Sequence, residues 1–195
     1  MLKVILTNDK LNTYFNNIIV DMKKIMIITI LCFTSLVSFA QISRTFWGCT
    51  LGKSNKNNVR TVLINRGYRV NTESDGSYTV KSNNIYFGGV NWSYVSFSFV
   101  NGILYDVWFQ NNEYESAISP DRVYEKLKLE LDEKYGRYYF YLGTDDGNTN
   151  WSNYSDGKTS ILLSVRYYNY TKYVSVSYFD EYLRQVKKQK ENDEL

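Results

Sequence analysis

Two segments of the chain, YVSFSF at residues 94–99 and YVSVSY at residues 173–178, alternate serine with apolar or aromatic residues. Successive side chains of a β-strand point to opposite faces, so each segment predicts a strand with one apolar face and one serine-rich face. Such strands are typical of antiparallel sheets that pack one face on a core and leave the other in water. The two segments therefore predict the centre of the fold, an antiparallel sheet with one packed face and one wet face.

Two other segments have the pattern of a helix. The first begins after Ser54, which can cap a helix, and ends before Gly67. The second begins at Ser119 and Pro120, because proline is favoured at the first helical position, and ends before Gly136. The apolar residues that share one face of each predicted helix are Val59, Val62 and Leu63 in the first and Val123, Leu127, Leu131 and Tyr135 in the second.

The remaining segments after residue 41 read as strands, and the order is strand, helix, three strands, helix, then three or four strands. A shift of 69 residues places Gly67 on Gly136 and residues 104–110 on residues 173–179, which indicates a weak internal repeat. Chance is the alternative, because side-chain identity between the halves is poor. Tight turns are predicted at the dipeptides Asp75-Gly76, Asn101-Gly102, Asp146-Gly147 and Asp156-Gly157.

This order predicts an α+β fold of two tandem helix-plus-antiparallel-sheet units of the αβββ type. The units cover about residues 47–112 and 117–180 and pack as one domain, residues 41–180. A charged C-terminal tail, residues 181–195, follows and begins with a short helix.

The segments GCTLGKSNKNNVRTVLINRGY, residues 48–68, and LKLELDEKYG, residues 127–136, look like the openings of the two units. The layout resembles the β-lactamase-inhibitor-protein-like folds and the small outer-membrane-assembly lipoproteins, over roughly Trp47 to Phe179. The resemblance is one of pattern and carries no functional residue over. It implies a protein secreted by a Gram-negative bacterium, in families whose members mostly bind proteins and in part are uncharacterised. The chain departs from the lipoproteins because Cys49, preceded by Phe46-Trp47-Gly48, is a poor lipid-attachment site.

The segment DMKKIMIITILCFTSLVSFAQ, residues 21–41, has the three parts of a secretion signal. Lys23 and Lys24 precede an apolar run, and Ser38 and Ala40 are the small residues of a cleavage site. We predict a signal peptide, residues 22–40, cleaved after Ala40, and export to the periplasm or medium. An uncleaved membrane anchor is the alternative, although the apolar run is short for one. Residues 1–21 are expected to be a non-native upstream extension.

Composition excludes several kinds of chemistry. The chain has no histidine, which rules out Ser-His-Asp and Cys-His mechanisms and zinc sites with imidazole ligands. Of two cysteines, Cys32 lies in the signal, so Cys49 is expected to be a free, buried strand cysteine. Without residues 1–40, which hold four of the 23 basic and two of the 20 acidic residues, the net charge falls from +3 to +1. No run of five like charges occurs before the C-terminal tail, so we predict no nucleic-acid partner. We therefore expect no enzyme activity, no cofactor and no metal site, and membrane contact only through the signal before cleavage.

Aromatic residues are frequent, with 19 tyrosines and four tryptophans, and some fall in phase with the serines of the wet face. Large rings on such a face suit a binding site, because they offer apolar area with little entropy to lose. Cross-strand packing that only stabilises the sheet is the alternative. The candidate ligand-binding residues are Trp92, Tyr94, Asp106, Trp108, Arg166, Tyr168 and Tyr173.

The sequence favours an exported protein that binds a protein or envelope component through this aromatic sheet face. A glycan- or small-ligand-binding protein that uses the same residues is the alternative. A carboxylate-dependent hydrolase is the third hypothesis. Its candidate carboxylates, none of whose spacings selects a pair, are Asp106, Glu113, Glu115, Asp145 and Asp146.

Overall fold

The computed structural model of the chain describes residues 19, 22, 41–115, 118–140 and 149–193. The chain forms two compact units, Met1–Ala40 and Gln41–Leu195. Of the first unit only Ile19 and Met22 are described, both helical and exposed. The predicted signal peptide and upstream extension therefore lie almost wholly outside the described residues, as do Asp145 and Asp146. Within the described part, no helix has the length and apolarity needed to cross a membrane.

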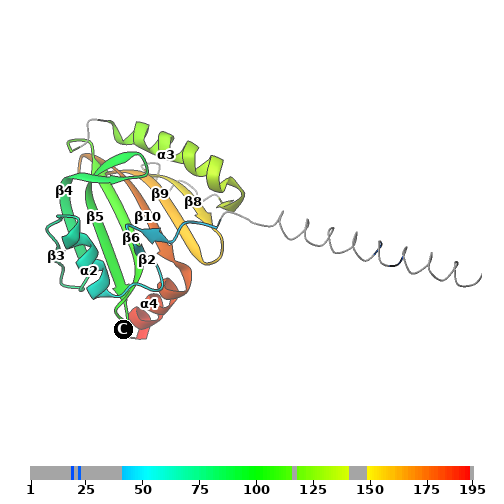
Figure 1. Cartoon of the computed structure of the whole chain (residues 1–195). Helices are drawn as coiled ribbons and strands as arrows, with labels where there is room; N and C mark the ends of the chain where they lie inside the picture. Colours follow the sequence, from blue (N-terminus) through cyan, green and yellow to red (C-terminus); the bar gives the residue numbers. More distant parts are fainter. Residues whose placement is uncertain (1–18, 20–21, 23–40, 116–117, 141–148, 194–195) are drawn as a thin grey trace, which may run out of the picture. The chain divides into compact units, whose positions relative to one another are not determined.

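The second unit is a mixed α+β structure with antiparallel strand pairing (Figure 1). It opens with a small two-stranded sheet, β1 (Thr45–Phe46) and β2 (Cys49–Thr50). The first helix and the strands that follow are α2 (Lys56–Asn65), β3 (Asn71–Thr72), β4 (Tyr78–Phe87), β5 (Val90–Val100) and β6 (Ile103–Asn112). The later elements are α3 (Pro120–Tyr135), the 3-10 helix η1 (Gly136–Tyr138), β7 (Tyr139–Phe140), β8 (Thr149–Ser155), β9 (Thr159–Tyr168), β10 (Thr171–Asp180) and α4 (Glu181–Asp193).

Eight strands form one sheet in the order β3-β4-β5-β6-β10-β9-β8-β7. The two alternating segments lie in β5 and β10, on either side of β6, so the predicted centre of the sheet is confirmed. Their apolar residues are buried, as Val95 and Val176 illustrate. The serines of the other face are less exposed than a wet face implies: Ser96 and Ser175 are buried, and Ser164 and Ser175 are hydrogen-bonded to each other at 2.9 Å.

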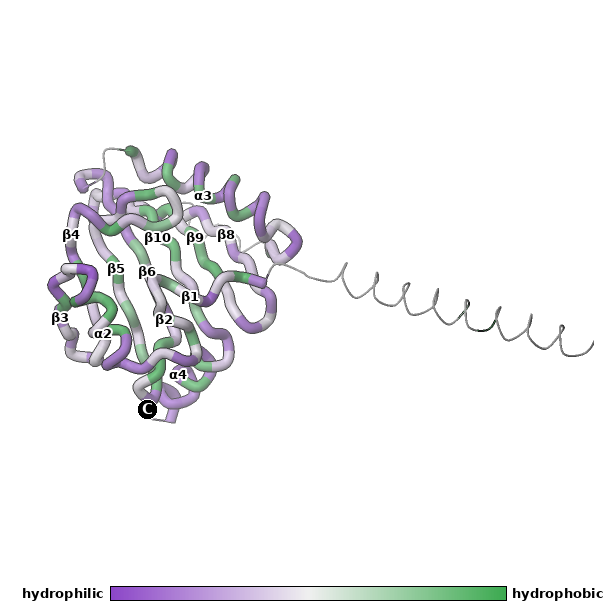
Figure 2. The backbone as a smooth tube through the Cα atoms, viewed as in Figure 1, coloured by the Kyte–Doolittle hydropathy of each residue, from purple (hydrophilic) through white to green (hydrophobic). Residues whose placement is uncertain are grey.

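The two faces of the sheet are covered differently. We call the side that carries Val95, Phe109 and Val176 the covered face, because α3 and the β1–β2 hairpin pack against it. Figure 1 shows α2 beside β3 to β5 and α3 along the other end of the strands. In Figure 2, apolar and polar stretches alternate along α3, and most of its apolar residues are buried, although Leu129 is 70% exposed.

The opposite side, which carries Tyr94, Trp108 and Ser177, is the polar face. Helix α4 packs across one end of it, with the guanidinium of Arg184 4.1 Å from the ring of Phe179. The segment predicted as a charged tail is thus a helix as far as Asp193, longer than the short helix we predicted. The rest of the polar face is left open by α4.

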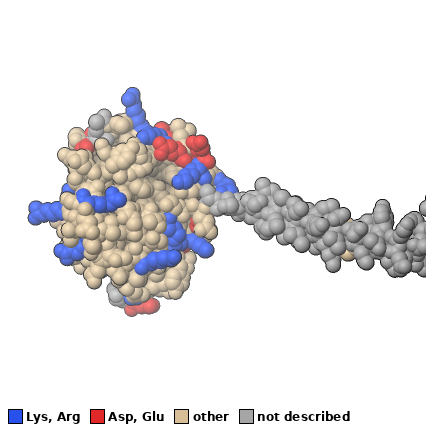
Figure 3. All heavy atoms as spheres, viewed as in Figure 1, with Lys and Arg blue, Asp and Glu red and all other residues tan. Residues whose placement is uncertain are grey.

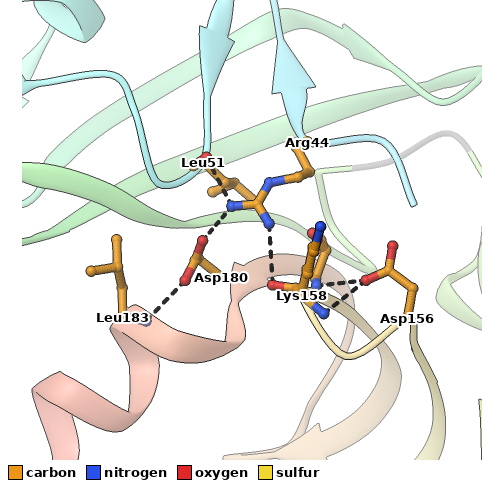
Figure 4. A network of polar contacts seen from close by, with 7 residues as sticks. Arg44, Leu51, Asp156, Lys158, Asp180 and Leu183 are labelled. Carbon is orange, nitrogen blue, oxygen red and sulfur yellow. Dashed lines mark hydrogen bonds and ion pairs between the residues drawn. The ribbon is translucent and has the colours of Figure 1, made fainter. Parts of the chain in front are cut away.

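An ion pair joins the start of the unit to the start of α4 (Figure 4). Arg44 pairs with Asp180, whose side chain is 9% exposed, and also donates to the backbone oxygen of Leu51 at 3.0 Å. The other oxygen of Asp180 accepts from the backbone N–H of Leu183 at 2.9 Å and so caps α4. Gly52 makes room for the pair, because a Cβ at this position would lie 2.7 Å from the Asp180 carboxylate.

The helix boundaries agree with the sequence in part. Asn55, and not Ser54, caps α2, with its side chain accepting from the N–H of Asn58 at 2.9 Å. Ser54 instead accepts from the N–H of Thr50. Gly67 follows the helix with φ 81°, as expected for a residue that ends a helix. Cys49 is free and buried, as predicted, and burial raises the pKa of its thiol.

Candidate ligand-binding groove

The open part of the polar face holds a groove of about 440 Å³ over β4, β5 and β6. We call it the aromatic groove. It is open to solvent, and polar and aromatic side chains line it. These residues are Lys81, Ser82, Asn83, Ser93, Tyr94, Trp108, Gln110, Asn112 and Glu115.

Tyr94 and Trp108 form an aromatic pair in the groove. Their ring centroids are 5.7 Å apart and their planes meet at 73°, an edge-to-face arrangement. The pairing of the strands explains the contact: Tyr94 lies opposite Gln110, so Trp108, two residues away, is its diagonal neighbour. Both side chains are half-buried, and burial raises the pKa of the Tyr94 hydroxyl. The pair offers apolar ring surface within an otherwise polar groove.

Several polar side chains of the groove are free to bind a ligand. Those of Lys81, Asn83 and Gln110 make no hydrogen bond to any described residue. Glu115, by contrast, is held in place, because the Ser93 hydroxyl donates to its carboxylate at 2.6 Å. The groove therefore combines donors and acceptors that lack protein partners with one oriented carboxylate.

The backbone of β5 is irregular where it passes the groove. Its pairing with β4 shifts register between β4 residues 81 and 85. On the other side of β5, the side chain of Asn111 in β6 binds the strand: its N–H donates to the Asn91 oxygen at 2.7 Å, and its oxygen accepts from the Ser93 N–H at 2.6 Å. As a result Ser93 and Tyr94 both line the groove, although consecutive side chains of a regular strand face opposite sides.

The placement of Trp92 on the polar face, predicted from alternation, is wrong. Trp92 is 1% exposed and packs against Phe109 with ring centroids 5.8 Å apart. Its indole N–H donates to the Phe87 oxygen at 2.9 Å. The irregularity in β5 puts Trp92 and Val95, three residues apart, together in the core. Trp92 is therefore a core residue and takes no part in the groove.

The other predicted residues fall into three places. Tyr173 lies opposite Asn112 and Arg166 lies opposite Tyr173, so both are beside the groove on the polar face. The Arg166 guanidinium is 5.9 Å from the Tyr173 ring, a cation–π contact. Tyr168 is exposed at the end of β9. Asp106 lies at the other end of the face, under α4, so the structure does not bring Asp106 and Arg166 together.

Sequence reasoning missed most of the polar lining, naming only Tyr94 and Trp108 as ligand-binding residues and Glu115 as a possible catalytic one. One signal could have been used. The run Lys-Ser-Asn-Asn at residues 81–84 interrupts the alternation of β4 exactly where the register shifts. A polar interruption of this kind in a strand is typical of an irregular, exposed segment.

Asp106 lines a second, smaller cavity of about 230 Å³ beneath α4. The Ser177 hydroxyl donates to its carboxylate, and Arg184, Lys187 and Glu191 of α4 line the same cavity. Burial raises the pKa of Asp106 to about 6, although the Ser177 hydrogen bond and the charges of Arg184 and Lys187 lower it in part. The folded protein therefore favours the protonated form of Asp106 more than the unfolded chain does.

A raised pKa makes stability fall as the pH rises. The contribution of Asp106 is fully present below about pH 4 and is lost as the pH rises through about 6. Between these pH values wild type should lose up to about 3 kcal/mol of unfolding free energy that an Asp106→Asn variant does not lose. Urea unfolding of both proteins at a series of pH values measures the difference. Parallel curves for the two proteins would contradict this assignment.

No group of three or more metal-ligating side chains occurs among the residues that the structure describes. Comparison of the chain with protein-family models, with curated proteins and with solved structures found no match.

Proposed function

We propose that the chain is a binding protein whose aromatic groove holds a glycan segment. The observation that carries the proposal is the Tyr94–Trp108 pair beside Lys81, Asn83 and Gln110, which have no hydrogen-bond partner among the described residues. A sugar ring presents apolar C–H groups that pack on aromatic rings, while its hydroxyls pair with amide and ammonium groups. The geometry therefore favours the glycan hypothesis over a flat protein interface at this place.

The positions of the candidate carboxylates support binding rather than hydrolysis. Glycoside hydrolysis uses two carboxyl groups that flank the scissile bond. Among the described residues that line the groove, Glu115 is the one carboxylate. Glu113 accepts from the backbone N–H of Lys172 at 3.0 Å, and Asp106 lies under α4. We therefore propose a role without catalysis.

A protein or envelope component is the second candidate partner, and a separate surface favours it. Three exposed tyrosines lie in two neighbouring segments: Tyr114 in one, and Tyr168 and Tyr170 in the other. The two segments are joined by a hydrogen bond of 3.0 Å from the Glu113 N–H to the Lys172 oxygen. Tyr170 is 87% exposed and has φ 61°, an unfavourable conformation for a bulky residue. Exposed tyrosines are enriched in protein interfaces.

We propose no nucleic-acid partner. The net charge is only +3, and on the face seen in Figure 3 the lysine and arginine side chains are scattered rather than gathered in one patch.

Two further predictions from the sequence belong to this proposal. Helix α2 precedes β3 to β6, and α3 precedes β7 to β10, with β6 and β10 paired at the centre; this order supports two tandem units.

Export after cleavage at Ala40 is also a proposal, which rests on the signal-like sequence of residues 22–40. N-terminal sequencing of exported protein should begin at Gln41, and the presence of residues 1–21 would contradict it.

An array of defined oligosaccharides tests the binding proposal. Wild type should bind one class of glycan, and a Tyr168→Ala/Tyr170→Ala variant should bind it equally. Binding that is lost in the tyrosine variant would favour the second candidate surface instead. An array with no bound glycan would contradict the glycan hypothesis.

A further inference from the structure

A third cavity, of about 250 Å³, lies on the covered face between α3 and the sheet. We call it the α3 cavity. Its walls are mostly apolar and come from four different elements. The apolar side chains that form them are Phe87, Trp92, Leu127, Leu131 and Val176. The cavity is separate from the aromatic groove, which lies on the other face of the sheet.

The turn between β4 and β5 closes one side of the α3 cavity. Gly88 and Gly89 both have positive φ, 58° and 65°, which suits a tight hairpin turn. The turn lies against α3: a Cβ on Gly88 would be 3.7 Å from Leu127, and Lys126 donates to the Gly89 oxygen at 2.8 Å. The cavity is thus formed by packed elements, and the residues that line it all belong to the described part of the chain.

Two tyrosine hydroxyls of the α3 cavity have protons to donate. Tyr178 is only 9% exposed, and its hydroxyl makes no hydrogen bond to any described residue. Tyr135 accepts from the Ser43 N–H at 3.3 Å, but its own proton has no acceptor among the described residues. Neither proton has an acceptor among the described residues, so both hydroxyls are available to a bound molecule that offers an acceptor oxygen.

The electrostatics of the α3 cavity fit an uncharged ligand. Burial raises the pKa of Tyr178, and the nearby Tyr135 and Glu130 raise it further, so its hydroxyl stays protonated and acts as a donor. Of the charged residues that line the cavity, Glu130 lies 3.9 Å from Lys126, and Lys134 lies over the Tyr135 ring. The charged residues beside the cavity therefore carry both signs, and this mixture favours neither an anionic nor a cationic ligand.

We propose that the α3 cavity binds a small, uncharged, mainly apolar molecule with one carbonyl oxygen, which accepts hydrogen bonds from Tyr178 and Tyr135. Its size suits the ligand, because an apolar cavity of about 150 Å³ is enough to bind benzene. By comparison, about 250 Å³ leaves room for a larger molecule, such as one with two aromatic rings. This site is independent of glycan binding in the aromatic groove.

The neutral, carbonyl-bearing fluorophore prodan tests the proposal. Titration into the folded protein should give saturable one-to-one binding and a blue shift of its emission. Tyr178→Phe keeps the ring and removes the hydroxyl, so binding should weaken about three- to tenfold. Leu131→Trp fills part of the cavity and should abolish binding. Near-ultraviolet circular dichroism establishes that each variant is folded.

Tyr124→Phe is the matched control. Tyr124 is also a tyrosine at the α3–sheet interface, but its hydroxyl is hydrogen-bonded to Ser152 at 2.8 Å and it does not line the cavity. This variant should bind prodan as wild type does. The proposal is wrong if wild type shows no saturable binding, or if Tyr178→Phe binds as tightly as Tyr124→Phe. If Leu131→Trp does not fold, the comparison of the two phenylalanine variants alone decides.

Discussion

Replacement of Asp180 with alanine is expected to lower the free energy of unfolding by about 3 kcal/mol, because it leaves the Arg44 guanidinium without its partner at a mostly buried position. The same change removes the cap of α4, since the Asp180 carboxylate accepts from the Leu183 N–H. Figure 4 shows why the loss should spread beyond the pair: Arg44 also holds the backbone oxygens of Leu51 and Lys158. Chemical denaturation measures the effect.

Two variants make this result specific. Asp180→Asn keeps an acceptor for the cap but loses the charge, so its loss of stability should lie between wild type and Asp180→Ala. Lys172→Ala breaks the exposed pair of Lys172 and Asp121 and should cost less than about 1 kcal/mol. If Asp180→Ala loses no more unfolding free energy than Lys172→Ala, the Arg44–Asp180 pair does not stabilise the packing of α4.

Trp92→Ala is expected to cost about 3–5 kcal/mol, the usual cost of removing a large buried aromatic side chain. Trp92 is buried between α3 and the sheet, and its indole N–H is hydrogen-bonded to the Phe87 oxygen. Trp108→Ala removes a side chain of the same type from the other face, where it is half-buried. That variant should cost less than about 2 kcal/mol.

The matched pair separates a core tryptophan from one that lines a site. Both variants are compared with wild type by urea denaturation at one pH. Equal losses of stability would mean that Trp108 is as structural as Trp92, and that the polar face is stabilised by its aromatic residues rather than kept open for a ligand.

Local patterns predicted the central strands well because period-two alternation is a local property. Val95 and Val176 are buried where the alternation places them. The pattern failed at Trp92, because the irregularity that turns it inward involves the pairing with β4 and the side chain of Asn111 in β6, and alternation within β5 encodes neither. The turn at Asn169 and Tyr170 was missed for a different reason, since a tyrosine with positive φ is rare and gives no turn signal.

The candidate site was predicted only in part. Tyr94 and Trp108 stood out because aromatic residues in phase with serine are unusual on a strand. Lys81 and Gln110 did not, because a polar side chain on a wet face is normally just solvated. The position of Asp106 could not be foreseen, since helix α4, which covers it, packs on the sheet through contacts that no local pattern encodes.

The central claim, that the aromatic groove binds a glycan, is tested most directly by the affinity of Trp108→Ala for the oligosaccharide that wild type binds. Isothermal titration of both proteins, at a temperature where each is folded, measures it. The variant should bind at least tenfold more weakly, because the ring that packs on the sugar is gone. Equal affinities of wild type and a folded Trp108→Ala variant would contradict the claim.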